Sequence, residues 1–185
     1  MFFLRGAVLR KIFLPIMCAF LAIATSVPAF ASTDSLTLTA HYQGWKVYRY
    51  HAKNGPVCFM SAPPQKEQGH YTSRGQVFFF VTHWPHGGGD HVVSVSAGYT
   101  YQKDSRVSLK VKDKTFTLFT QGAMAWTQDE TEDDAVVKEI KSGETMIIKG
   151  TSSRGTRTTD TYSLKGSTDA YRAMMRACSE EHGKK

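Results

Sequence analysis

Residues 145–164, TMIIKGTSSRGTRTTDTYSL, contain the pattern that decides the fold of this 185-residue chain. Residues 145–151 have the apolar and β-branched composition of a β-strand. In residues 157–164, threonine, tyrosine and leucine alternate with more polar positions, which is typical of a strand with one exposed face. The segment Ser153-Arg154-Gly155-Thr156 between them predicts a turn. We therefore expect an antiparallel pair of strands here.

Strand-like segments of the same kind recur toward the N-terminus, separated by turn signals. Asn54-Gly55-Pro56 predicts a turn between two of them, and Pro63-Pro64 ends the second. Residues 76–84 are apolar at almost every central position, which indicates a strand covered on both faces. The other segments are residues 45–50, 57–60, 91–99, 106–111, 115–121 and 123–127.

Two segments have helical rather than strand periodicity. Thr131 with Asp134 three residues later resembles a capping box and predicts a helix over residues 132–142 that stops at Gly143. The second helix has its apolar residues on one face, at Ala170, Ala173, Met174, Ala177 and Cys178. About eight strands with two short helices predict an all-β protein, an antiparallel β-sandwich with a short internal helix and a C-terminal helix.

The N-terminal segment, residues 1–31, has the composition of a secretory signal peptide. Basic residues precede an uninterrupted apolar stretch, residues 12–24, which is shorter than the about 20 residues of a membrane-spanning helix. Ala29 and Ala31 supply the small residues of a signal-peptidase site, so we expect cleavage after Ala31. An uncleaved anchor is the alternative. We predict a single mature domain, residues 32–185, that is periplasmic or secreted and not stably inserted in a membrane.

Removal of this segment changes the charge and the cysteine count. It contains three basic residues, no acidic one and Cys18, so the net charge falls from +7 to +4 and Cys58 and Cys178 remain. Two cysteines in an oxidising compartment are most simply explained by one disulfide. The alternatives are a redox pair or two metal ligands, and the chain has no C-x-x-C spacing to favour either. The low net charge also argues against nucleic acid as a partner.

The densest group of potential metal ligands lies in the stretch HWPHGGGDH at residues 83–91. Three imidazoles and a carboxylate can bind zinc, copper or nickel, but their spacing matches no closed structural site. A glycine-containing hairpin loop explains the stretch without a metal, and its Trp84 would also suit a loop that binds a partner. We therefore predict no cofactor and no metal, with four residues kept as candidate ligands: His83, His86, Asp90 and His91.

Two other polar stretches could carry chemistry. The acidic run 129–134 lacks the residue order of a calcium-binding loop, and acids at a helix N-terminus explain it. Ser153 and Asp160 with a histidine could form a nucleophilic triad, but no G-x-S-x-G or S-x-x-K motif marks the serine. A buried pair between Asp160 and an arginine is the simpler interpretation. We predict no catalytic residues and expect that the protein is not an enzyme.

The stretch quoted first also carries a family resemblance. Residues 150–156 (GTSSRGT), followed by residues 158–164 (TTDTYSL) and a helix that ends at Cys178, resemble the invasion-associated locus B (IalB) family. The resemblance covers nearly all of the mature chain, from about Gly44 to Cys178. Three further segments are similar to the family: Gly44-Trp45 with Val57-Cys58, residues 92–99 and residues 116–126.

The resemblance implies an exported protein of Gram-negative bacteria with an immunoglobulin-like β-sandwich, whose cysteine pair corresponds to Cys58 and Cys178. Founding members of the family are associated with invasion of red blood cells, and the resemblance brings no catalytic residues. The main hypothesis is a non-enzymatic interaction protein with a protein or envelope partner, linked to invasion or to envelope function. The alternative is a periplasmic protein that binds a metal or small ligand through the His83–His91 loop. The oligomeric state is left open.

Overall fold

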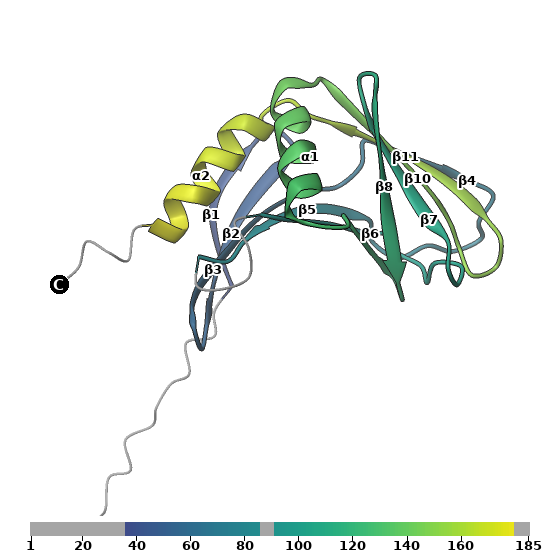
Figure 1. The fold of residues 1–185 in the computed structure, drawn as a ribbon, viewed down its shortest axis with the longest axis horizontal. Helices are drawn as coiled ribbons and strands as arrows, with labels where there is room; N and C mark the ends of the chain where they lie inside the picture. Colours follow the sequence, from purple (N-terminus) through teal and green to yellow (C-terminus); the bar gives the residue numbers. More distant parts are fainter. Residues whose placement is uncertain (1–35, 86–90, 180–185) are drawn as a thin grey trace, which may run out of the picture. The chain divides into compact units, whose positions relative to one another are not determined.

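Eleven strands and two helices make up the described part of the chain (Figure 1). The computed structural model describes residues 36–85 and 91–179, which belong to the unit Thr33–Lys185. The predicted signal peptide with its cleavage site at Ala31, and the candidate ligands His86 and Asp90, lie outside these residues. The helices are α1 (Glu130–Ser142) and α2 (Ser167–Ser179). The strands are β1 (Thr37–Tyr42), β2 (Trp45–Ala52), β3 (Gly55–Ala62), β4 (Lys66–Gly69), β5 (Phe78–His83), β6 (Val92–Ser96), β7 (Arg106–Val111), β8 (Lys114–Gln121), β9 (Met124–Trp126), β10 (Thr145–Thr151) and β11 (Arg157–Ser163).

The strands form one sheet in which every neighbouring pair is antiparallel. Their order across the sheet is β1-β2-β3-β5-β6-β9-β8-β7-β10-β11-β4. The short strand β9 pairs with β6 on one side and with β8 on the other. It therefore joins the half of the sheet that contains β1 to the half that contains β11.

The sheet folds back on itself, so that its two halves enclose a common core. Trp45 of β2 donates a hydrogen bond from Nε1 to the carbonyl oxygen of Ser163 at the end of β11, at 3.1 Å. Phe79 of β5 meets Tyr162 of β11 edge to face, with ring centroids 6.3 Å apart. These contacts join strands that are distant in the sheet order. The predicted all-β class with sandwich-like packing is confirmed, although the two layers are parts of one continuous sheet.

The hairpin predicted from residues 145–164 is present as β10 and β11. Along β11 the buried residues are Thr158, Asp160 and Tyr162, and the residues between them are half-buried. This period of two is what the alternation in the sequence predicts. In β5 the period is the same: Phe79, Val81 and His83 are buried, whereas the opposite face is half-buried instead of fully covered.

Two strands at the edges of the sheet were not predicted from the sequence. Strand β4 is exposed at all four positions and is held by backbone pairing with β11, so it has no apolar face that periodicity could detect. Strand β1 also lacks a buried residue and has a register shift between Leu38 and Ala40. Edge strands depend more on backbone hydrogen bonds than on a buried face, which explains both omissions.

Helix α1 begins two residues earlier than the predicted capping box implied. Its N-cap is Asp129, whose carboxylate accepts a hydrogen bond from the backbone N–H of Glu132 at 2.9 Å. Glu132 in turn accepts one from the N–H of Gln128 at 2.8 Å. The prediction that Thr131 is the cap was wrong because Asp129, two residues upstream, is also a strong capping residue. The predicted stop is confirmed at Gly143, where a Cβ would overlap the side chains of Val111 and Leu164.

Helix α2 packs beside β1, β2 and β3 (Figure 1). Its buried stripe, Ala170, Ala173, Met174, Ala177 and Cys178, is the one that the sequence predicts. Cys178 forms a disulfide with Cys58 of β3, with the two Cα atoms 5.8 Å apart, as expected from the cysteine count. The bond closes a loop between positions 120 residues apart and attaches the C-terminal helix to the sheet. Neither described helix is long and apolar enough to cross a membrane.

We predict that reducing the Cys58–Cys178 bond lowers the free energy of unfolding by about 2–5 kcal/mol, because the unfolded chain regains the entropy of the long loop. Urea denaturation of the wild-type protein with and without dithiothreitol measures the difference. The double variant Cys58→Ala/Cys178→Ala is the control, since its stability should not respond to the reductant. Two reactive thiols in unreduced exported protein would show that the bond does not form.

Candidate functional site

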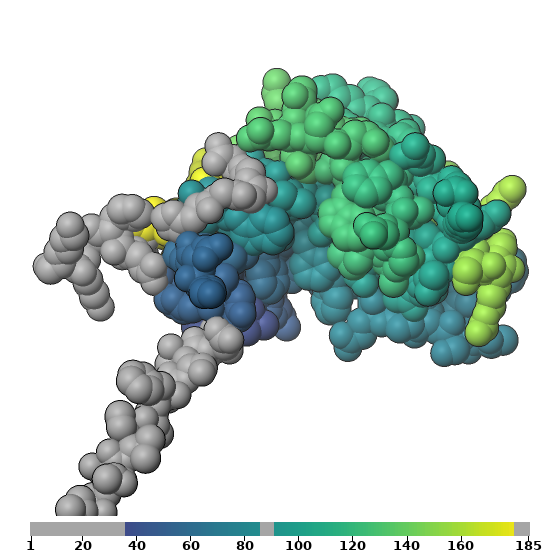
Figure 2. Space-filling view, turned by 60° about the horizontal axis from the view of Figure 1, so that its bottom comes forward, coloured from purple at the N-terminus to yellow at the C-terminus, as the bar shows by residue number. Residues whose placement is uncertain are grey.

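A cavity of about 390 Å³ opens between three segments that are far apart in the sequence. They are residues 70–75 between β4 and β5, residues 98–100 after β6, and residues 152–158 at the turn from β10 into β11. We call this cavity the turn pocket. In Figure 2 the yellow-green turn between β10 and β11 lies beside the blue segment that precedes β5. The cavity falls in the size range of small-ligand sites, about 300–1,000 Å³.

The turn that forms one wall is held by Ser152. The Ser152 hydroxyl oxygen accepts hydrogen bonds from the backbone N–H groups of Arg154 (3.3 Å) and Thr156 (3.1 Å). The backbone of Ser152 also donates to the Thr156 carbonyl oxygen at 2.9 Å. Gly155 has φ of 81°, a left-handed conformation that glycine adopts without strain. The tip of the turn is therefore fixed from within, and Ser153 and Arg154 are exposed on it.

Two glycines join the other walls. The N–H of Gly75 donates to the carbonyl oxygen of Gly98 at 2.8 Å, and Gly98 has φ of 70°. A Cβ atom on Gly98 would overlap the Gly75 carbonyl group. Only glycine at position 98 allows both the backbone conformation and this close approach. The segment before β5 is thereby attached to the segment after β6.

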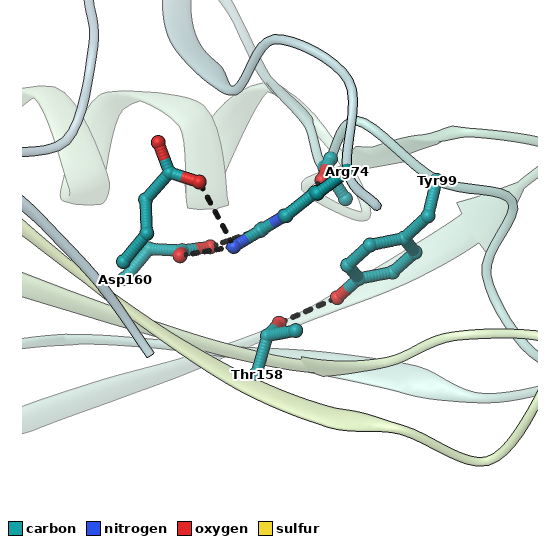
Figure 3. Close-up of polar contacts among 6 residues, drawn as sticks. Arg74, Tyr99, Thr158 and Asp160 are labelled. Atoms are coloured by element: carbon teal, nitrogen blue, oxygen red, sulfur yellow. Dashed lines mark hydrogen bonds and ion pairs between the residues drawn. The ribbon is translucent and has the colours of Figure 1, made fainter. Parts of the chain in front are cut away.

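Arg74 lines the pocket and forms a buried ion pair with Asp160 (Figure 3), and we call this ion pair the floor of the pocket. Arg74 donates two parallel hydrogen bonds to the Asp160 carboxylate, Nη1 to Oδ1 and Nη2 to Oδ2, each at 2.7 Å. Its Nε donates to the carbonyl oxygen of Ala97 at 2.8 Å. The side chains of Arg74 and Asp160 are only 3% and 4% exposed. The more exposed Glu67 lies 3.5 Å from Nη1.

Tyrosine rings enclose the guanidinium group. Its Cζ lies 5.0 Å from the ring centroid of Tyr99 and 5.5 Å from that of Tyr71, within range of cation–π attraction. The Tyr99 hydroxyl is 2.6 Å from the hydroxyl of Thr158, on the strand that carries Asp160 (Figure 3). A Cβ on Gly150 would overlap the Tyr99 hydroxyl. The ion pair, the rings and the glycine thus form one packed unit.

The pKa values follow from this burial. Burial alone would lower the pKa of Arg74, but the hydrogen bonds and negative charge of Asp160 outweigh it and raise that pKa above its ordinary value. Burial raises the pKa of Tyr99, and the hydrogen bond to Thr158 and the charge of Arg74 only partly oppose it. Arg74 is therefore a permanent cation and Tyr99 a neutral hydroxyl at neutral pH.

The structure assigns Asp160 the simpler of its two expected roles. Both carboxylate oxygens bind Arg74, so the predicted buried pair with an arginine is present and its partner is identified. Ser153 lies exposed on the turn and lines the pocket. Among the residues that line the pocket, no hydrogen bond joins the imidazole of His70 to a hydroxyl group. The triad considered from the sequence is not assembled in this part of the chain.

Of the candidate metal ligands, the structure describes His83 and His91. His83 is 7% exposed at the end of β5, and its ring centroid lies 6.3 Å from that of His91. Both ring nitrogens of His91 are engaged, Nδ1 with Asp134 at 2.9 Å and Nε2 with the Tyr171 hydroxyl at 2.5 Å. Within residues 36–85 and 91–179, no group of three or more His, Cys, Asp or Glu side chains could hold a metal ion.

A metal at His91 would therefore have to displace a hydrogen bond that the structure contains. Elemental analysis of the purified mature protein tests whether His86 and Asp90 bind a metal. The neighbouring Trp84 is 42% exposed and remains a candidate contact residue.

The acidic run 129–134 belongs to the N-terminus of α1, as the sequence indicates. Its most buried member is Asp133, whose Oδ1 accepts hydrogen bonds from the N–H of Val93 at 2.7 Å and from the Thr127 hydroxyl. Burial raises the pKa of Asp133, and these two hydrogen bonds only partly oppose the rise. The charged form of Asp133 is thus disfavoured in the folded protein.

We predict that Asp133→Asn becomes more stable relative to the wild-type protein as the pH rises from about 4 toward 7. A raised folded-state pKa adds stability below the unfolded pKa, and this stability is lost as the pH rises through the folded value. The amide oxygen can still accept both hydrogen bonds but does not ionise. Urea denaturation across this pH range measures the difference, with exposed Asp113→Asn as the charge control. A difference that does not change with pH would contradict the prediction.

With this geometry in place, the comparisons with known proteins assign the family. The profile of the invasion associated locus B (IalB) protein family matches residues 45–175. The chain belongs to this family. The fold is similar to that in the crystal structure of invasion associated protein B from Bartonella henselae, with a TM-score of 0.56 and 17% sequence identity, covering 78% of this chain and 99% of that chain. No curated protein matches the chain.

The resemblance identified from residues 150–164 is confirmed by the IalB match. Sequence reasoning did not find Arg74, Tyr71 or Tyr99, because the turn pocket is built by contacts between distant segments. The only local signal was Asp160, an acid on the inward side of a strand, which requires a cation nearby.

We predict that Arg74→Ala lowers the free energy of unfolding by about 3 kcal/mol or more, because it leaves the buried Asp160 carboxylate without a partner. Arg172→Ala is the matched control: Arg172 forms an exposed pair with Asp169 at 3.5 Å, and its loss should cost less than about 1 kcal/mol. Chemical denaturation of both variants makes the comparison. Equal losses of unfolding free energy in the two variants would show that the buried ion pair stabilises the fold no more than the exposed one.

Proposed function

We propose that this IalB-family chain is an exported, non-enzymatic binding protein that recognises its partner at the turn pocket. The observation that carries the proposal is the contrast between the floor of the pocket and its rim. Hydrogen bonds within the protein already use the polar groups of Arg74, Asp160 and Ser152. By contrast, the side chains of Ser153 and Arg154 are exposed at the rim. A rigid floor with an exposed polar rim suits recognition, because little conformational freedom of the backbone is lost on binding.

Export is supported by two independent features. The N-terminal segment has an apolar core and ends with small residues at Ala29 and Ala31, as signal peptides do. Disulfides such as Cys58–Cys178 persist in oxidising compartments and are rare in the cytosol. We therefore propose a periplasmic or secreted protein cleaved after Ala31.

The proposal of a binding role rather than an enzymatic one depends on the chemistry of the pocket. Activation of Ser153 as a nucleophile would need a base that is itself oriented by an acid. The buried acid that pairs with a pocket residue, Asp160, has both oxygens on Arg74. The hydroxyl groups of the pocket are therefore suited to hydrogen bonding with a ligand.

The partner we propose is a protein or a component of the envelope, and not nucleic acid, since the mature charge is only +4. The family and the related structure carry the words "invasion associated" in their names. We extend that association to this chain as a role in contact with the envelope or with a host cell. The metal-binding alternative depends on the His83–His91 loop and is tested by elemental analysis.

We predict that a photo-crosslinking amino acid at Thr156, in the turn pocket, captures a specific partner in intact cells. The same amino acid at Asp113, an exposed turn position between β7 and β8, is the control and should capture none. Crosslinked products are compared by gel electrophoresis and identified by mass spectrometry. Identical products at both positions would contradict recognition at the pocket.

The same cells test export. The purified periplasmic or secreted protein should begin at Ser32 when its N-terminus is sequenced. A chain that keeps residues 1–31 and stays in the cytoplasm would contradict the proposal.

A further inference from the structure

The turn pocket has an unusual lining, which indicates the chemistry of its ligand. Of its fourteen lining residues, seven are serine or threonine and two are tyrosine. None of the fourteen has an aliphatic side chain, and none carries a carboxylate. A ligand with a large apolar surface would find little to pack against here. The lining instead suits a ligand that offers many hydrogen-bonding groups.

The hydroxyl groups of the lining fall into two sets. Those of Ser152 and Thr158 are used inside the protein, by the turn and by Tyr99. The other five hydroxyl groups belong to exposed or half-buried residues, which are Thr72, Ser73, Thr100, Ser153 and Thr156. None of these hydroxyls makes a hydrogen bond with another described residue, although some of the backbones do. These five come from all three walls, so they surround whatever occupies the pocket.

The charge of the pocket is positive at its rim. Arg74 lies in the floor, where Asp160 balances it. Arg154 is exposed at the tip of the turn and forms no ion pair with any residue in the described part of the chain. A ligand with a negative group beside its hydroxyls would therefore bind more favourably than a neutral one.

Two features separate a saccharide from a peptide. Both strands at the turn are already paired, β10 with β7 and β11, and β11 with β10 and β4. Neither β10 nor β11 has a free edge to which a peptide could add, and the edge strand β4 does not line the pocket. Tyr71 and Tyr99 each cover Arg74 with part of the ring, but both are half-buried residues that also line the pocket, and their remaining aromatic surface is of the kind that packs against the C–H groups of a sugar ring.

We propose that the turn pocket binds an acidic sugar residue, such as a uronic acid within a glycan. The five serine and threonine hydroxyls that are not used inside the protein bind the hydroxyl groups of the sugar. Tyr71 and Tyr99 contact its ring, and Arg154 binds its carboxylate. This inference deepens the proposed function and rests on it, because it names the chemical class of the partner at the same pocket.

The first test uses the exported protein with its disulfide intact and isothermal titration calorimetry. The probes are a tetrasaccharide that contains glucuronic acid, a neutral glucose tetrasaccharide and a hexaglutamate peptide. We expect the acidic saccharide to bind about tenfold or more tightly than the neutral one, because a hydrogen bond to a charged group contributes about that factor. Hexaglutamate should bind more weakly than the acidic saccharide.

Two matched pairs of variants locate the binding. Arg154→Gln should weaken binding of the acidic saccharide about tenfold, whereas Arg157→Gln, on an exposed neighbour that does not line the pocket, should change it less than twofold. Thr156→Val removes one hydroxyl and should weaken binding about threefold to tenfold, with Thr159→Val as its control. Thermal unfolding of each variant checks that the fold is kept.

Several results would overturn the inference. They are no binding of the acidic saccharide, equal affinity for the neutral one, and equal losses in the Arg154 and Arg157 variants. Binding of hexaglutamate as tightly as the saccharide would also overturn it, by assigning the pocket to an acidic protein segment. If saccharides fail while crosslinking at Thr156 still captures a partner, only the ligand class is wrong. Failure of both experiments would remove the proposed function as well.

Discussion

The turn pocket depends on the ion pair between Arg74 and Asp160. Removing two charges from water costs several kcal/mol for each ion, and a buried pair recovers this only with good geometry and further hydrogen bonds. Arg74 meets both conditions, because its guanidinium group binds both Asp160 oxygens and the Ala97 carbonyl group. One side chain from an irregular segment thus connects β11 with the segment that follows β6. Lysine could not do this, since it lacks the planar fork of donors.

The ion pair and the disulfide have the same structural role in different halves of the sheet, since each attaches another segment of the chain to a strand. Cys58–Cys178 attaches α2 to β3, whereas Arg74–Asp160 attaches the segment before β5 to β11. Between them lies the shared core, in which Phe79 and Tyr162 meet. Each constraint joins elements that the hydrogen bonds of the sheet do not connect. A sheet of eleven strands that folds back on itself needs such connections, because its own pairing fixes only neighbouring strands.

The parts of the fold that could be predicted are those with a local physical cause. The alternation along β11 and the apolar stripe of α2 reflect a buried face, and both were found from the sequence. Strand β4 has no buried face, so only its pairing with β11 reveals it. The partner of Asp160 lies 86 positions away, and no spacing rule selects Arg74 among the basic residues of the chain. The candidate site therefore required the tertiary structure.

The residues that carry the family resemblance fall into two groups, those that shape the turn and those that are exposed on it. In GTSSRGT, Gly150 leaves room for the Tyr99 and Tyr101 rings, Ser152 holds the turn and Gly155 adopts its left-handed conformation. These roles belong to the scaffold: a substitution at Ser152 or Gly155 would disturb the turn, and one at Gly150 would disturb the packing of the tyrosines. The side chains of Ser153 and Arg154, by contrast, are exposed at the rim and form no hydrogen bond or ion pair with another described residue, although the backbone N–H of Ser153 donates to the Thr100 carbonyl oxygen at 2.8 Å. In this chain, the residues that carry the family resemblance therefore include those that build one wall of the pocket. The side chains of Ser153 and Arg154 are not used in this scaffold, so the proposed recognition of a ligand depends on them and not on the residues that shape the turn.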